Sequence, residues 1–257
     1  MSLKVKKTFQ DHIAVIQIDN PPMNPLDVEV MDGLRNAFEE LLLEKDVRCI
    51  ILTGTGKAFV AGADIKELKR WTPEASVRLN GKGQQLVNQI EQFPCPVIAA
   101  INGYALGGGL EIAMGCDIRL ASEKAKVGLP ETKLGIIPGY GGTVRLPRTI
   151  SVGAAKKMIY TAAHITAQEA MQLGLVQEVL PADKLMERAM ELARTIAANA
   201  PLAVQAVKQT INRCREAGLE KSLESELFFA KKCYATTDSQ IGIDAFISKT
   251  TPEFIGQ

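Results

Sequence analysis

Three short apolar segments rich in β-branched residues limit how this chain can fold. They are His12–Asp19, Val47–Thr53 and Pro96–Asn102, and each has the length of a buried strand rather than of a helix. Between the first two, the segment Val30–Glu44 repeats apolar residues at helical spacing with charged residues between them, as an amphipathic helix does. Strands that alternate with helices predict an α/β fold.

A run of three glycines, Gly107 to Gly109, follows the third strand and precedes the apolar start of a helix. Glycine lets the backbone approach a ligand, and the free N–H groups of a first helical turn attract negative charge. Tight turns of this kind, and a first-turn glutamate such as Glu111, are also ordinary connections and caps. However, a second glutamate, Glu131, lies in Gly-Leu-Pro-Glu before a glycine-rich loop, where no packing role for a carboxylate is evident. The combination indicates a functional site.

A second small-residue loop, Ala61-Gly62-Ala63, precedes Asp64-Ile65-Lys66-Glu67. The latter has the form of a capping box and predicts a helix that begins at Asp64. The loop leaves backbone N–H groups accessible after the second strand, as the glycine run does after the third. Two such loops are able to supply one N–H each to the same oxygen.

Two N–H donors and two carboxylates suit the chemistry of a thioester or another activated carbonyl. Its oxygen becomes anionic when a nucleophile adds at the β-carbon or a base removes the α-proton, and preorganised donors stabilise that anion. The carboxylates transfer protons, and their proximity in an apolar pocket tunes one toward an acid and the other toward a base. The residues needed for other reaction types are missing. A serine or cysteine triad has little support, because the chain has only His12 and His164 and no G-x-S-x-G motif. Gly54–Lys57 does not complete a phosphate-binding loop, and the dinucleotide-binding fingerprint is absent from the sequence.

The rest of the chain divides into one irregular segment and a series of helices. Residues 71–82 lose helical periodicity and contain Pro73 and Gly81, which fits a mobile or substrate-adjacent segment as well as an ordinary surface loop. Helical patterns then cover Val152–Tyr160, Thr166–Leu173 and Asp183–Ala198 with Thr166 and Asp183 as N-caps, Pro201 to Gly218, and a stripe from Leu223 to Tyr234. The change to all-helical character predicts a boundary between residues 1–195 and residues 196–257.

Charge and cysteine content exclude several classes of protein. Thirty Lys and Arg against 29 Asp and Glu give a net charge of +1, which provides no general attraction to nucleic acid or anionic lipid. The five cysteines are widely spaced with no C-x-x-C, so neither a disulfide framework nor a metal site is predicted. Because the sequence has no signal-peptide pattern and no apolar run of membrane-spanning length, we expect a cytoplasmic protein without membrane contact.

Three separated segments carry a family resemblance: AFVAGADIKEL, NGYALGGGLEIAMGCDIRLA and GLPETKLGIIPGYGGTVRLPR. They resemble the signature segments of the crotonase (enoyl-CoA hydratase/isomerase) family in the same order, and the similarity of pattern extends from Val5 to Phe254. The resemblance implies a spiral of repeated ββα units with an acyl-CoA site in residues 1–195. It also implies a C-terminal α-helical trimerisation region in residues 196–257, and hence a homotrimer or a hexamer formed by two trimers.

By position, the resemblance implies an enoyl-CoA hydratase, a lyase of the kind used in fatty acid β-oxidation. The backbone N–H groups of Ala63 and Gly108 would form the oxyanion hole, and Glu111 and Glu131 match the two glutamates of members that hydrate enoyl-CoA. In those members both side chains hold one water, which adds reversibly and syn to a trans-2-enoyl-CoA to give 3-hydroxyacyl-CoA. Glu131 would be the principal acid and base, while Glu111 orients the water. The thioester supplies the electron sink, so no metal, flavin or nicotinamide cofactor is expected.

Contacts with the substrate and its CoA are implied for a further set of positions: Ala61, Asp64, Ile65, Lys66, Gly139, Tyr140, Phe246 and Lys249. Lys66 matches a position near the CoA adenine and phosphates, whereas Phe246 and Lys249 match C-terminal positions that in some members reach the CoA of a neighbouring subunit. Two residues depart from the common pattern. Leu129 replaces the glutamine of well-known mitochondrial hydratases, and Tyr140 stands where a small residue is common and would narrow the acyl pocket.

Two other functions stay open beside the hydratase. An enoyl-CoA isomerase or another enolate-forming acyl-CoA enzyme of the same fold often needs only one of the two glutamates, so the presence of both favours hydration. A non-catalytic assembly protein or an RNA-binding relative is the third alternative, and the balanced charge speaks against RNA binding. Acyl chain length and physiological direction stay open as well.

Overall fold

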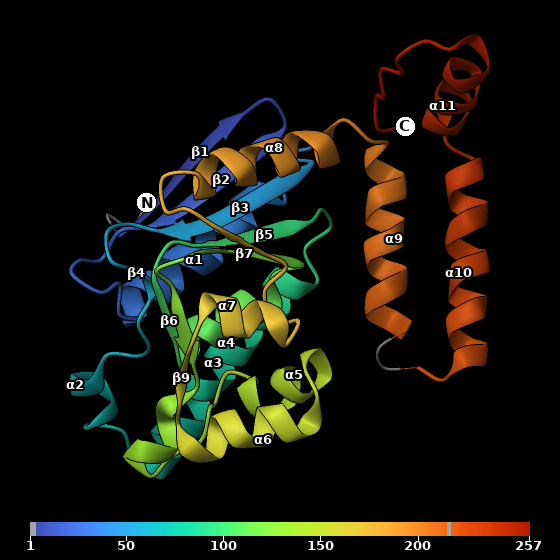
Figure 1. The fold of residues 1–257 in the computed structure, drawn as a ribbon. Helices are drawn as coiled ribbons and strands as arrows, with labels where there is room; N and C mark the ends of the chain where they lie inside the picture. The colour runs from blue at the N-terminus through green and yellow to red at the C-terminus, as the bar shows by residue number, and fades with distance from the viewer. Residues whose placement is uncertain (1–3, 215–216) are drawn as a thin grey trace.

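A computed structural model describes residues 4–214 and 217–257, and Figure 1 shows β-sheets covered by helices, with three C-terminal helices standing to one side. The larger sheet has six strands in the order β1-β2-β3-β5-β7-β10. Its strands are β1 (Val5–Gln10), β2 (Ile13–Ile18), β3 (Cys49–Gly54), β5 (Val97–Ile101), β7 (Ile118–Ser122) and β10 (Glu178–Leu180). Only β1 is antiparallel to its neighbour within this sheet. The predicted α/β class and its three apolar strands are confirmed.

A smaller four-stranded sheet lies beside the first in the order β4-β6-β8-β9. Its strands are β4 (Ala58–Val60), β6 (Tyr104–Leu106), β8 (Lys126–Gly128) and β9 (His164–Thr166), and only β9 is antiparallel to its neighbour. Three times along the chain, a strand of the larger sheet is followed by a strand of the smaller sheet and then by helices. This repetition is the spiral of ββα units that the family resemblance implied, and the predicted fold class is confirmed.

Helices cover both sheets and make up the whole C-terminal part of the chain. They are α1 (Val28–Leu41), α2 (Ile65–Leu68), α3 (Pro73–Glu91), α4 (Gly108–Gly115), a 3-10 helix (Pro130–Leu134), α5 (Gly142–Thr149), α6 (Val152–Thr161), α7 (Ala167–Gln172), α8 (Leu185–Ala197), α9 (Pro201–Cys214), α10 (Leu219–Tyr234) and α11 (Thr237–Ser248). The predicted N-caps Asp64 and Thr166 are confirmed, since each side chain accepts a hydrogen bond from a backbone N–H of the first turn.

The two faces of the larger sheet contribute to two separate hydrophobic cores. Side chains alternate between the faces along a strand, so Ile50 and Leu52 of β3 pack under α1 and α3, while Cys49 and Ile51 face α8. Helix α8 meets the second face with residues spaced four apart, from Leu185 to Ala197. Both faces of the larger sheet are therefore buried from solvent. This explains why apolar and polar residues do not alternate along its strands.

Residues 73–82 are helical, so the expectation of an irregular surface loop there was wrong. They form the first half of α3, in which Thr72 is the N-cap and Pro73 occupies the first turn, where its missing N–H has no intrahelical acceptor to lose. Gly83 weakens the helical pattern but is required by packing. A Cβ at this position would lie 2.2 Å from the ring of Tyr140.

Two helix boundaries also differ from the prediction. Asp183 is not an N-cap, because α8 begins one residue later than expected, after Lys184, which makes no capping bond through its side chain. Gly218 does not end the preceding helix but is the N-cap of α10, whereas the described part of α9 ends at Cys214. Residues 215–216 lie outside the described residues.

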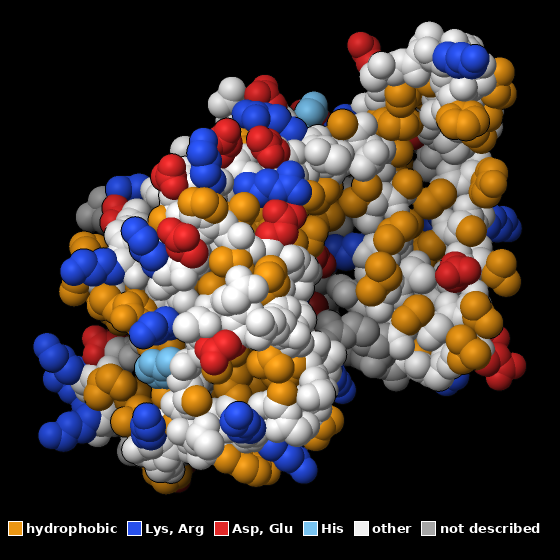
Figure 2. Space-filling view, viewed as in Figure 1, with side chains coloured by type: hydrophobic (Ala, Val, Ile, Leu, Met, Phe, Trp, Pro, Cys, Tyr) orange, Lys and Arg blue, Asp and Glu red, His pale blue; other side chains and the backbone are white. Residues whose placement is uncertain are grey.

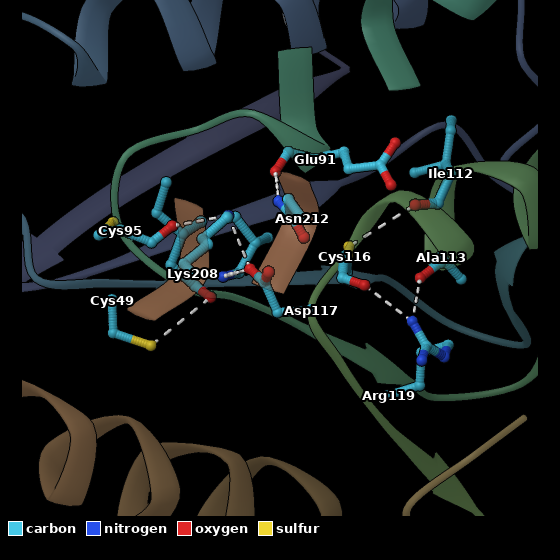
Figure 3. A network of polar contacts seen from close by, with 12 residues as sticks. Cys49, Glu91, Cys95, Ile112, Ala113, Cys116, Asp117, Arg119, Lys208 and Asn212 are labelled. Carbon is cyan, nitrogen blue, oxygen red and sulfur yellow. Dashed lines mark hydrogen bonds and ion pairs between the residues drawn. The ribbon is translucent and has the colours of Figure 1, made fainter. Parts of the chain in front are cut away.

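Polar contacts connect the C-terminal helices to the sheet layer. Lys208 of α9 is 7% exposed, and its Nζ lies 2.7 Å from Asp117 Oδ2 and 3.0 Å from the Cys95 carbonyl oxygen, as Figure 3 shows. Asn212, one turn further, donates to the Glu91 carbonyl oxygen. Arg48 donates to the carbonyl oxygens of Ala197 and Phe254. A cavity of about 520 Å³ lies between α9 and the body around these contacts.

Large apolar side chains on α9, α10 and α11 are exposed in the single chain, and Figure 2 shows them as patches on these helices. The set comprises Val207, Ile211, Leu219, Leu223, Leu227, Phe228, Tyr234, Ile243, Phe246 and Ile247. Exposed apolar surface on this scale is typical of a face that associates with another protein. The predicted boundary after residue 195 falls in the last turn of α8, and the division into two regions stays a prediction.

Candidate active site

The smaller sheet brings three distant segments of the chain together. Strands β4, β6 and β8 are parallel neighbours, so their carboxyl ends lie side by side. Gly62 and Ala63 follow β4, Gly107 follows β6, and Glu131 comes three residues after β8. Consistent with this, a Cβ at Gly107 would lie 2.8 Å from Glu131 Oε1 and 3.8 Å from Gly62 Cα. The two small-residue loops and the second glutamate therefore meet at one place.

Both loops present backbone N–H groups there. Leu26 forms a parallel bridge with Ala63, in which Leu26 N–H donates to the Gly62 carbonyl and Asp64 N–H donates to the Leu26 carbonyl. These two hydrogen bonds are made by Gly62 and Asp64, the residues on either side of Ala63. The Ala63 N–H is therefore directed away from Leu26. Gly108 is the first residue of α4, whose N–H has no intrahelical acceptor. Among the described residues, neither N–H donates to a protein atom.

The turn before α4 requires glycine for two reasons. Gly107 has a φ of 52°, in the left-handed region that other residues adopt at a cost, and its N–H donates to the Gly128 carbonyl at 2.8 Å. Gly109 approaches β4 so closely that a Cβ would lie 2.1 Å from the Val60 carbonyl oxygen. The glycine run therefore fixes the start of α4 against β4, whereas the sequence predicted that its backbone approaches a ligand.

Glu111 lies in the first turn of α4 and is 1% exposed. Its Oε1 accepts hydrogen bonds from the N–H of Tyr140 at 2.8 Å and of Gly142 at 2.6 Å. Gly142 has to be small, because a Cβ there would lie 2.9 Å from the same oxygen. The glycine-rich loop that follows Glu131 in the sequence thus holds Glu111 in place through its backbone.

Glu131 lies in the 3-10 helix and is half-buried. Its Oε1 faces Gly107, whereas its Oε2 is buried and has no hydrogen-bond partner among the described residues. A buried carboxylate oxygen without a partner costs free energy, and such atoms mark sites that bind a water or a ligand. The free Oε2 is therefore the atom of this site that is ready to exchange a proton.

Burial raises the pKa of both glutamates to about 7. At Glu111 the negative charge of Glu131 adds to this rise, while the two backbone N–H bonds and the charge of Arg145 oppose it. Two carboxyls that titrate near neutral pH share protons readily, and groups with such pKa values are efficient general acids and bases. The pair is thus suited to take a proton from one atom and return it to another.

Arg145 and α3 support this arrangement and were not predicted from the sequence. Arg145 Nη1 donates to the Tyr140 carbonyl, and its Nη2 lies 2.7 Å from Glu91 Oε2 and 2.6 Å from Asn88 Oδ1. Gln84 of α3 donates to the Gly139 carbonyl at 2.9 Å. An arginine three residues after a glycine pair gives no signal in a single sequence, because its partners are 54 and 57 residues away.

The predicted substrate positions fall into two distant groups. Ala61, Asp64, Ile65 and Lys66 lie on the segment from β4 to α2, and Ile65 is 59% exposed. Gly139 and Tyr140 lie beside Glu111. Phe246 and Lys249, in contrast, belong to the end of α11, which Figure 1 shows at the opposite end of the molecule from α2. A single chain therefore does not bring these two residues to the glutamates.

Within the described ranges, no three His, Cys, Asp or Glu side chains converge in a way that would hold a metal ion. No helix in these ranges has the length and apolar character needed to cross a bilayer.

Comparison with known proteins gives matches over nearly the whole chain. The model of the family described as enoyl-CoA hydratase/isomerase matches residues 8–257. A putative enoyl-CoA hydratase/isomerase of Bacillus subtilis is 44% identical over 252 residues, or 96% of this chain and 95% of that one. A short-chain-enoyl-CoA hydratase of Clostridium acetobutylicum is 43% identical and covers 92% of each chain. The crystal structure of an enoyl-CoA hydratase from Bacillus anthracis superposes with a TM-score of 0.96 at 41% identity, covering 99% of this chain and 100% of that one.

Proposed function

The chain belongs to the enoyl-CoA hydratase/isomerase family and is an enoyl-CoA hydratase, and we propose that Glu111 and Glu131 are its catalytic residues. The single observation that carries this proposal is the pair of carboxyls with pKa values raised to about 7, one of which keeps a buried oxygen without a protein partner. The reaction is the reversible syn addition of water to a trans-2-enoyl-CoA, which gives a 3-hydroxyacyl-CoA.

The thioester carbonyl oxygen binds between the N–H groups of Ala63 and Gly108. Addition of water at the β-carbon moves negative charge onto this oxygen, and the positive end of α4 lies behind the Gly108 donor. The donors stabilise the enolate more than the neutral ground state, so they lower the barrier to addition. Removal of one such donor in other enzymes typically costs about 3 kcal/mol.

One water molecule binds between the two glutamates and supplies all the added atoms. Glu131 accepts a proton from the water through Oε2 as the water oxygen bonds to the β-carbon, and the electron pair of the double bond moves toward the carbonyl. Glu131 then returns the proton to the α-carbon, so the carboxylate is regenerated and one water is consumed. Glu111, fixed through Oε1 by two N–H groups, orients the water from the other side. No metal, flavin or nicotinamide takes part.

We also propose that the exposed apolar faces of α9, α10 and α11 assemble the chain into a homotrimer or a dimer of trimers. Residues 196–257 form this assembly region and residues 1–195 the acyl-CoA domain. In such an assembly, Phe246 and Lys249 bind the CoA of a neighbouring subunit, while Ala61, Asp64, Ile65 and Lys66 bind the CoA of their own. The buried free thiols of Cys49, Cys95 and Cys116 fit a cytoplasmic location.

Steady-state hydration of crotonyl-CoA, followed as loss of the enoyl absorbance, tests the assignment. Glu131→Gln and Glu111→Gln each remove a proton-transfer group while keeping its size, and we expect kcat to fall roughly 10²–10⁴-fold. The exposed carboxylate Glu123 provides the control, because Glu123→Gln leaves kcat near the wild-type value. Near-normal turnover in either active-site variant, with folding verified by circular dichroism, contradicts the assignment.

A further inference from the structure

Two side chains separate the glycine turn from a cavity between α1 and α3. A Cβ at Gly108 would lie 2.8 Å from Leu26 Cδ1 and 3.1 Å from Tyr140 Cε2, so both side chains pack directly on the backbone that carries the proposed donor. Leu26 is 3% and Tyr140 6% exposed. Both also line the cavity, whose volume is about 360 Å³. They therefore form a wall with the reacting centre on one side and empty space on the other.

The cavity suits the apolar end of an acyl chain. Four of the side chains that line it are apolar and at least partly buried, namely Met31 of α1, Leu79 and Leu86 of α3, and Trp71 between α2 and α3. The exposed side chains Arg35, Lys82 and Gln85 line it where it meets solvent, and the partly buried carboxylates of Asp27 and Glu67 also contribute to its wall. A volume of this size accommodates several methylene groups.

The ring of Tyr140 is fixed in the wall from two sides. Gly83 provides the space for it, because a Cβ on Gly83 would lie 2.2–2.4 Å from ring atoms Cδ1, Cε1 and Cγ. The Tyr140 backbone is held by its N–H bond to Glu111 and by Arg145, whose Nη1 donates to the Tyr140 carbonyl oxygen. Because Gly83 belongs to α3, the ring packs directly against this helix and occupies the space between the glycine turn and the cavity.

We propose that the Tyr140 ring, seated in the notch at Gly83, closes the passage from the oxyanion site to the cavity between α1 and α3 and thereby restricts the enzyme to short acyl groups. This inference rests on the proposed function, since it concerns the substrate of the same site. A crotonyl group ends before the wall. A longer acyl chain meets the ring, and entry into the cavity requires the ring to move.

The test compares kcat/KM for trans-2-octenoyl-CoA with kcat/KM for crotonyl-CoA in three proteins with altered walls. Each newly buried methylene contributes roughly fourfold in binding, so Tyr140→Ala is expected to raise the ratio about tenfold or more. Tyr140→Phe keeps the ring and is expected to keep the wild-type ratio. Tyr140→Ala combined with Leu79→Trp refills the cavity, so the ratio is expected to return toward the wild-type value.

A binding measurement keeps the inference testable if Tyr140→Ala lowers turnover by loosening the loop around Glu111. Competitive inhibition constants of octanoyl-CoA and butyryl-CoA, or calorimetric affinities when turnover is too slow, give the same ratio without chemistry. An unchanged ratio in Tyr140→Ala, in a wild-type background that hydrates crotonyl-CoA, overturns the inference and leaves the proposed function standing. A wild-type protein that hydrates neither thioester refutes both.

Discussion

Replacement of Glu111 by glutamine is expected to make the protein more stable at high pH while it removes activity. Glu111 is almost fully buried, and burial together with the charge of Glu131 raises its pKa from an ordinary value of 4.5 to about 7. A carboxyl whose pKa is raised by folding binds more protons in the folded state than in the unfolded state between these two values. Stability is therefore lost as the pH rises from 4.5 through 7.

The size of the stability change follows from the difference between the pKa of Glu111 in the folded protein and its ordinary value. One pKa unit corresponds to about 1.4 kcal/mol, so ionised Glu111 lowers the free energy of unfolding at pH 8 by about 3 kcal/mol relative to pH 4. Glutamine carries no charge, yet its amide oxygen still accepts from the Tyr140 and Gly142 N–H groups. The variant keeps these contacts and avoids the cost of the buried charge.

Thermal unfolding at pH 5 and at pH 8, at one protein concentration, measures the effect. For a chain of this size about 1 kcal/mol corresponds to roughly 2–4 °C in Tm, so the advantage of Glu111→Gln over wild type is expected to grow by about 5 °C or more between the two pH values. The exposed Glu44 gives the matched control, since Glu44→Gln removes a charge that folding leaves in water. A difference between Glu111→Gln and wild type that does not change with pH, or that shrinks as pH rises, refutes the reasoning.

Two further predictions concern Arg145 and Lys208. The charge of Arg145 lowers the pKa of Glu111, so Arg145→Met is expected to move the acidic limb of the kcat/KM profile to higher pH, whereas Arg148→Met, an exposed change on the same helix, leaves the limb in place. Lys208→Met removes the cation that donates to Asp117 Oδ2, so urea denaturation is expected to show a loss of about 3–5 kcal/mol. Adding Asp117→Asn removes the unpaired charge and is expected to recover part of this loss; no recovery contradicts the ion-pair explanation.

Local patterns in the sequence were sufficient for three of the six strands of the larger sheet, β2, β3 and β5, and for most helices. Their apolar runs and helical stripes reflect burial within one element, which a single sequence records. The strands of the smaller sheet were not read individually, because three residues are too few to display alternation. Helix α3 was missed because Gly81 and Gly83 weaken its propensity, and the need for Gly83 comes from Tyr140, 57 residues away.

In the site, too, features within one segment could be predicted from the sequence, whereas contacts between distant segments could not. Glu131 stood out because it follows Pro130 before a glycine-rich loop, where a carboxylate has no evident packing role, and Glu111 because it lies two residues after the glycine run. Their environment was not visible, since the donors to Glu111 are main-chain N–H groups at positions 140 and 142. Backbone donors carry no residue identity, so only the folded chain reveals them.

The parallel alignment of β4, β6 and β8 has a consequence for how such a protein can diversify. Positions 62, 107 and 131 are 45 and 24 residues apart in the sequence. The sheet brings them to within one or two strand spacings of each other, each about 4.8 Å. The helices between these positions extend away from the three parallel strands, and the chain then returns to the sheet. Insertions or substitutions in these helical segments can change which acyl groups fit, while the catalytic atoms keep their distances from one another. Substrate selectivity and reaction chemistry can therefore evolve on separate parts of the chain.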